Sequence, residues 1–302
     1  MLRNPQHIKG FFALLAVACS VLLGLPLSSG ALPPSSFGWT PPAFTRLDSL
    51  FIISATGEPR FKAQRDSCRI LLVAKDIETL DYLIAERLKG QTPRQRHYVE
   101  ELFVAIADSG RNHPAAARLA RALTEVPDSI KVQLLNIGSE LHAVDFLPTA
   151  INYLKVENPE VKRSAIRNLG MYPDERNIVL LFDGLDKAPN LERQERLWAL
   201  SKQAPLTAAE WPTLLPLFHD DYFYNRVLVR QIIAKAVAGD WRALAKHCPN
   251  APDDRERLEW ILLALDMPGT ASKAYVKSQM RLLEPNQTRF ILSILADSTG
   301  MR

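Results

Sequence analysis

The segment PDSIKVQLLNIG (residues 127–138) recurs 32 positions later as PEVKRSAIRNLG (residues 159–170), and a weaker copy, NLERQERLWAL (residues 190–200), follows after another 31 positions. Each copy keeps two aliphatic residues three positions apart: Leu134 and Ile137, Ile166 and Leu169, Leu197 and Leu200. This spacing places both side chains of a pair on one face of a helix. The repeat therefore predicts helices whose apolar faces pack against their neighbours in sequence.

The same helical periodicity extends along the chain from about Thr45. Thr92-Pro93 and Asn158-Pro159 have the form of helix starts, and Thr207 to Glu210 fits a capping box. No stretch alternates apolar and polar residues as a half-buried strand does. The sequence predicts an all-α protein with helices at 46–54, 60–74, 77–89, 93–109, 114–125, 128–139, 143–155, 159–170, 174–187, 190–203, 208–218, 222–238, 240–247, 253–266, 270–283 and 286–297.

Short connections between so many helices favour antiparallel packing of each helix on the next. A four-helix bundle cannot hold them all, whereas stacked helical hairpins can. We therefore expect residues 46–302 to form one helical-repeat domain, an α-solenoid of stacked antiparallel hairpins.

The second copy also carries a family resemblance. Residues 158–170 (NPEVKRSAIRNLG), then Pro173-Asp174-Glu175 and a second helix from Ile178 to Leu185, resemble a HEAT-like repeat of the short bacterial form, which includes phycobilin-lyase-type relatives. Lys162 stands where the family more often has Arg. The similarity is clear over 158–203 and weaker over 127–157 and 208–266. The resemblance implies a HEAT/ARM-like superhelix that binds proteins, and it carries no catalytic residues to transfer.

Residues 1–31 have the pattern of a secretory signal peptide. Arg3 and Lys9 precede an apolar run from Phe11 to Leu27, and small residues lead to a cleavage position after Ala31. We expect an exported protein, periplasmic or secreted, with a proline-rich leader over residues 32–45.

Two alternatives to cleavage remain open. The apolar run is close to the length that spans a bilayer, so it could stay as an anchor that leaves the chain facing outside the cytosol. Cys19, in Ala16-Val17-Ala18-Cys19, is a possible lipidation site, although the hydrophobic run continues beyond it. A mature N-terminus at Leu32 would exclude both.

Composition and net charge limit the classes of binding partner that the sequence suggests. The chain is 47% hydrophobic and 23% charged, which is ordinary for a globular protein. Residues 1–31 contain two basic residues and no acidic one. The rest of the chain therefore has 35 basic and 33 acidic residues. This balance gives no electrostatic reason to expect nucleic-acid binding, or membrane binding other than through the N-terminal segment. Cys68 and Cys248 could form one disulfide or remain two separate thiols.

We expect no catalytic, cofactor-binding or metal-binding residues, because the sequence lacks phosphate-binding loops, dinucleotide fingerprints, nucleophile elbows and paired metal ligands. The one compact polar cluster is His219-Asp220-Asp221. As a metal or acid–base site it would need partners from elsewhere in the fold. The other interpretation is structural, with His219 at the end of one helix and an aspartate capping the next.

The densest aromatic run follows this cluster. Tyr222-Phe223-Tyr224 comes shortly after Trp211 and Phe218. Aromatic residues beside polar groups are typical anchors of protein interfaces, so Tyr222, Tyr224 and Trp211 are our candidate partner-binding residues. The alternative is a core stripe made of Phe223, Val227 and Ile233.

Three functions are compatible with these patterns. The first is an exported, non-catalytic scaffold or adaptor that binds a protein partner through its solenoid surface. The second is a lyase-type enzyme, or the partner of one, with a site in the solenoid groove; a deep pocket with convergent titratable groups would favour it. The third is a structural envelope component tethered to the membrane by its N-terminus, which fractionation would reveal.

Overall fold

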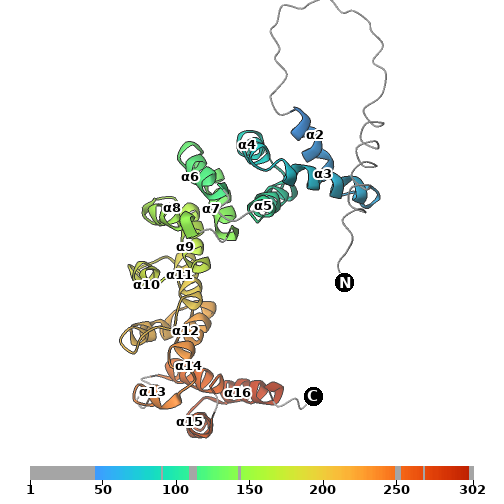
Figure 1. Cartoon of the computed structure of the whole chain (residues 1–302). Helices are drawn as coiled ribbons and strands as arrows, with labels where there is room; N and C mark the ends of the chain where they lie inside the picture. Colours follow the sequence, from blue (N-terminus) through green and yellow to red (C-terminus); the bar gives the residue numbers. More distant parts are fainter. Residues whose placement is uncertain are drawn as a thin grey trace, which may run out of the picture. The chain divides into compact units, whose positions relative to one another are not determined.

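The computed structural model describes residues 45–89, 91–108, 114–141, 144–248, 253–267 and 269–298, all of which belong to one unit, Phe44–Arg302. The predicted signal peptide with its cleavage position after Ala31, Cys19, and the leader up to residue 44 lie outside this part. Throughout the described residues the regular structure is helical and no strand occurs, which confirms the all-α prediction (Figure 1). None of the described helices has the length and apolar character needed to cross a membrane.

Most helices lie close to the ranges predicted from the sequence, but the helix predicted at 143–155 is divided into a short α-helix between two 3₁₀ segments. The α-helices are α2 (Thr45–Ser54), α3 (Lys62–Ala74), α4 (Ile77–Glu86), α5 (Pro93–Ala107), α6 (Ala115–Glu125), α7 (Asp128–Glu140), α8 (Leu147–Asn152), α9 (Pro159–Met171), α10 (Glu175–Phe182), α11 (Asn190–Lys202), α12 (Phe223–Ala236), α13 (Trp241–Ala245), α14 (Asp254–Leu265), α15 (Thr270–Met280) and α16 (Pro285–Ser298). The described residues also include the 3₁₀ segments η1 (Pro59–Phe61), η2 (Val144–Phe146), η3 (Tyr153–Lys155) and η4 (Trp211–His219).

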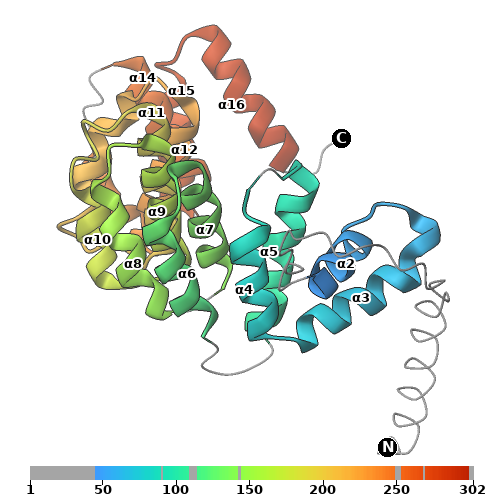
Figure 2. The same ribbon diagram turned by 90° about the horizontal axis from the view of Figure 1, so that it is seen from above.

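The repeated segments form helices that pack on one another. Helix α7 contacts α9, α9 contacts α11, α11 contacts α12, and α12 contacts α14, a succession that can be followed in Figures 1 and 2. All members of the repeated aliphatic pairs are at most 1% exposed: Leu134, Ile137, Ile166, Leu169, Leu197 and Leu200. The aliphatic positions that repeat in the sequence are therefore positions that are buried in the core.

Polar side chains also join successive helices. Asn168 on α9 donates from Nδ2 to the Leu135 carbonyl of α7 (2.8 Å), and Gln203 at the end of α11 donates from Nε2 to the Leu169 carbonyl of α9 (2.8 Å). Lys235 on α12 donates in turn to a carbonyl at the end of α11 (3.0 Å). The Leu169 and Ser201 carbonyls lie in the last turns of their helices, where carbonyls have no intrahelical partner.

Two glycines of the repeat permit close packing. A Cβ atom on Gly138 would lie 2.0 Å from Cε1 of Phe146, and one on Gly170 would lie 2.5 Å from Cζ3 of Trp198. Both distances are far below van der Waals contact. The glycine that ends each of the first two copies is thus required by the side chain packed against it.

The prediction of an α-helix at 208–218 is wrong about the type of helix. The structure has the 3₁₀ segment η4 here, because Pro216 lies inside it and has no N–H to donate to an α-helical partner. The predicted capping box is half formed, since the Thr207 N–H donates to the Glu210 carboxylate (2.7 Å) but no α-helix follows.

The two cysteines of this part do not form a disulfide with each other. Both side chains are buried, and burial raises the pKa of the Cys248 thiol to about 12. Of the two interpretations left open by the sequence, separate buried thiols hold.

Candidate functional site

The aromatic run lies where η4 ends and α12 begins. Tyr222 precedes the first residue of α12, and Tyr222, Phe223 and Tyr224 are 45%, 55% and 45% exposed. Three consecutive large aromatic side chains therefore present much of their surface to solvent. Phe223 does not belong to a core stripe, which in α12 is formed by buried residues further along the helix, such as Leu228 and Ile233.

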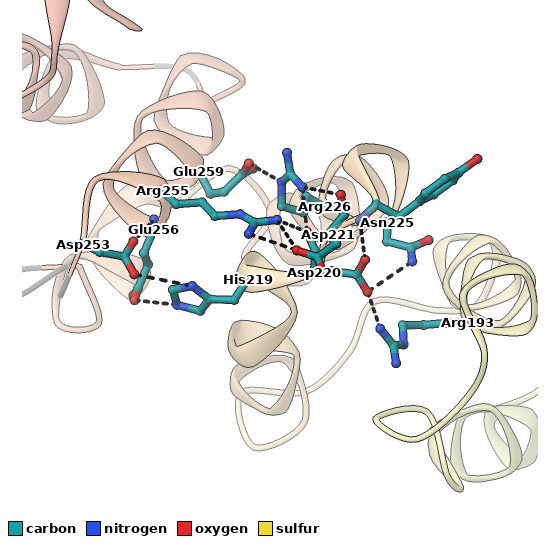
Figure 3. Close-up of polar contacts among 11 residues, drawn as sticks. Arg193, His219, Asp220, Asp221, Asn225, Arg226, Asp253, Arg255, Glu256 and Glu259 are labelled. Atoms are coloured by element: carbon teal, nitrogen blue, oxygen red, sulfur yellow. Dashed lines mark hydrogen bonds and ion pairs between the residues drawn. The ribbon is translucent and has the colours of Figure 1, made fainter.

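Asp220 holds this turn in place. Its side chain is 1% exposed and accepts hydrogen bonds from the Tyr222 N–H (2.7 Å), Asn225 Nδ2 (3.2 Å) and Arg193 Nη1 (2.5 Å). Figure 3 shows the bonds from Asn225 and Arg193. Asp220 has a structural role, but it does not cap α12 as predicted, because Tyr222 is the N-cap residue and no side chain caps this helix. The Arg193 bond ties the turn to the preceding helix α11.

The ionisation of Asp220 stabilises the fold. Burial is the largest single effect on its pKa and raises it, but the bonds from Arg193, the Tyr222 N–H and Asn225 together outweigh burial and hold the pKa below its usual value. A carboxyl group with a lowered pKa in the folded state contributes stability above its unfolded pKa of about 4. That contribution is lost as the pH falls through the folded pKa.

We therefore expect Asp220→Asn to flatten the acid side of the stability profile. The free energy of unfolding of the wild-type protein should fall from about pH 5 downward. Over that range, the free energy of unfolding of the variant should fall less steeply, by up to about 1.4 kcal/mol per pH unit. Asp174 and Asp253, whose pKa values are also lowered, will keep part of the slope. Urea unfolding at a series of pH values measures it, and parallel profiles would contradict this role.

A second buried carboxylate supports the aromatic run from α14. Glu259 is 1% exposed, pairs with Arg226 (Nε to Oε1, 2.7 Å) and forms a short ion pair with Arg230. Arg226 also donates to the Asp220 carbonyl (2.6 Å). Both guanidinium groups lie over the ring of Phe223, at 5.4 Å and 6.0 Å from its centroid. The exposed phenyl ring therefore packs on two guanidinium groups that Glu259 holds in place.

The remaining members of the polar cluster join the turn to α14. His219 faces Asp253 (Nδ1 to Oδ2, 3.6 Å) and Glu256 (Nε2 to Oε2, 3.3 Å), and Arg255 pairs with Asp221 (3.3 Å), as drawn in Figure 3. The His-Asp-Asp motif is thus split between different partners. Within the described part of the chain, no three or more His, Cys, Asp or Glu side chains are grouped so that they could hold a metal ion.

Trp211 does not share the exposed surface predicted for it. It is 3% exposed and makes an edge-to-face contact with His247, with ring centroids 4.8 Å apart. Phe218 is also buried and packs edge-on against Trp260. The structure therefore keeps Tyr222 and Tyr224 together and adds Phe223 to them, but places Trp211 in the core.

Sequence reasoning missed the groups that support the aromatic run, mainly Arg193 and Glu259. Arg193 lies 27 residues before Asp220, and Glu259 lies 29 residues after Arg230. Both separations are close to the repeat period of about 31 residues. The period is therefore the feature of the sequence from which these pairs could have been predicted. No protein-family model matches the chain, and no curated protein matches it either.

Proposed function

We propose that this chain is an exported, non-catalytic scaffold that binds a protein partner through Tyr222, Phe223 and Tyr224, the aromatic patch. The observation that carries the proposal is that three adjacent aromatic side chains are about half exposed on a turn fixed by buried ion pairs. Tyrosine and phenylalanine supply large contact areas and lose little conformational entropy on binding. A fixed turn lowers the ordering cost further.

The charged groups around the patch favour binding over catalysis. Asp220 is bonded to Arg193 and Asn225, and Glu259 to two arginines, so these carboxylates are committed to holding the turn. A general acid or base has to exchange a proton with a substrate, which would break such a pair. A supporting role for an adjacent surface is the simpler use of this chemistry.

The proposal includes an α-solenoid of HEAT-like hairpins. Its support is the succession of contacts from α7 through α14, the cross-links about one repeat apart, and the matching glycines at 138 and 170. Repeat arrays expose long surfaces on which a patch of this kind serves as an anchor. Export rests on the signal-peptide pattern of residues 1–31.

The double substitution Tyr222→Ala, Tyr224→Ala is expected to abolish partner capture. Interface tyrosines often contribute 2 kcal/mol or more, so the loss of both should weaken binding by about 100-fold or more. Neither side chain makes a bond that the turn needs, since Asp220 binds the backbone of Tyr222. The measurement is quantitative mass spectrometry of proteins captured from the native compartment by the mature chain.

Phe290→Ala is the matched control. Phe290 is an exposed aromatic residue on α16 (45% exposed), far along the chain from the patch. A partner retained by the wild-type chain and by Phe290→Ala, but lost from the tyrosine variant, supports the proposal. Equal capture by all three chains would remove the patch as the binding surface.

A further inference from the structure

A second region, distinct from the aromatic patch, carries unpartnered polar groups. A pocket of about 360 Å³ lies between the connection from α4 to α5, the first turn of α5 and the first turns of α7. This volume is within the usual range for small-molecule sites. Its lining is Leu88, Lys89, Gln91, Arg96, Pro127, Ser129, Ile130 and Gln133.

The amide of Gln133 is the central observation. The residue is 6% exposed, lines the pocket, and its Nε2 group has no hydrogen-bond partner. Gln91, which also lines the pocket, has neither a donor partner nor an acceptor partner for its amide. A buried amide without a protein partner costs about 1–3 kcal/mol, so these two amides are available to hydrogen-bond a group that enters the pocket.

The lining is rich in donors and positive charge. Lys89 and Arg96 are cationic and form no ion pair within the described residues, and no acidic side chain lines the pocket. The start of α7 lies here as well, with no side chain capping it, so its N–H groups and dipole add positive potential. The nearby Asp128 is engaged by Lys131 and Asn158 and does not line the pocket.

We propose that this pocket binds an oxyanion, a carboxylate or a phosphate monoester, carried on a small apolar group. The Gln133 and Gln91 amides donate to the anion together with Lys89 and Arg96. Leu88, Pro127 and Ile130 contact the apolar part of the ligand. The lining has two cationic side chains and no anionic one, so it favours an anionic ligand over a neutral or cationic one.

The test is calorimetric titration of the mature chain at low salt with N-acetyl-leucine, butyl phosphate and the neutral N-acetyl-leucinamide. We expect saturable binding of one or both anions, at least about tenfold tighter than the amide. Binding of N-acetyl-leucine alone identifies a carboxylate site, and binding of butyl phosphate alone identifies a phosphate site. Absence of saturable binding for both anions overturns the proposal.

Variants separate this site from a structural role for the same residues. Arg96→Gln and Gln133→Leu should each weaken anion binding about tenfold or more, whereas Arg121→Gln, an exposed arginine of α6 outside the pocket, should not. Gln133→Leu should leave the melting temperature of the ligand-free protein unchanged or raised, because it removes an unpartnered buried amide. Anion binding unaffected by both pocket variants would also overturn the proposal.

Discussion

Replacing Glu259 with leucine is expected to lower the free energy of unfolding by about 3–5 kcal/mol. The carboxylate is 1% exposed and is the shared partner of Arg226 and Arg230, whose side chains are 15% and 8% exposed. Its removal leaves two neighbouring guanidinium groups that repel each other with little access to water. Urea unfolding followed by circular dichroism measures the loss.

The double variant Glu259→Leu, Arg230→Leu provides the control for packing. It removes the more buried cation together with its partner, and apolar replacement of a whole buried pair is often close to neutral. Arg226 keeps its bond to the Asp220 carbonyl. We therefore expect the double variant to be clearly more stable than Glu259→Leu alone. If the second substitution instead adds its own destabilisation, the cost does not come from unpaired buried charge.

Most helix starts could be predicted because their signals are local. Thr92 accepts a hydrogen bond from the Gln95 N–H (3.3 Å), and Asn158 accepts from N–H groups in the first turn of α9, as the residue types at these positions predict. Helix ends depend on backbone choices that are harder to foresee. Helix α10 ends at Phe182 and not near 187, and Gly184 follows with a φ of +70° that does not continue a helix.

The environment of each side chain was less predictable. Trp211 is predicted to lie beside the tyrosines, but it shares the buried face of η4 with Leu214 and Phe218, at three- and four-residue spacings that are also visible in the sequence. Glu259 looks like any charged residue of a solvated face in the sequence. Only the packing of α14 on α12 brings it to Arg226 and Arg230, so its burial depends on tertiary structure.

The substitution Phe146→Ala is expected to destabilise the protein by about 3–5 kcal/mol, because the ring is fully buried and the cavity it leaves is lined by rigid helices. The same ring explains why position 138 is glycine. Gly138→Ala should cost about 1–3 kcal/mol through overpacking, even though alanine favours a helix by up to about 1 kcal/mol. Urea midpoints of both single variants and of their combination measure these effects.

The double variant Gly138→Ala, Phe146→Ala tests whether the Phe146 ring packs closely on Gly138. Phe146→Ala removes the three atoms that lie nearest to a methyl group at position 138, so Gly138→Ala should become neutral or stabilising in that background. In a Phe103→Ala background it should remain destabilising, because Phe103 is a buried phenylalanine of the same core whose ring is not among the nearest atoms to Gly138. A Gly138→Ala effect that is equal in all three backgrounds would mean that Phe146 does not pack on this glycine, and the packing of η2 on α7 would then have to differ from the arrangement described here.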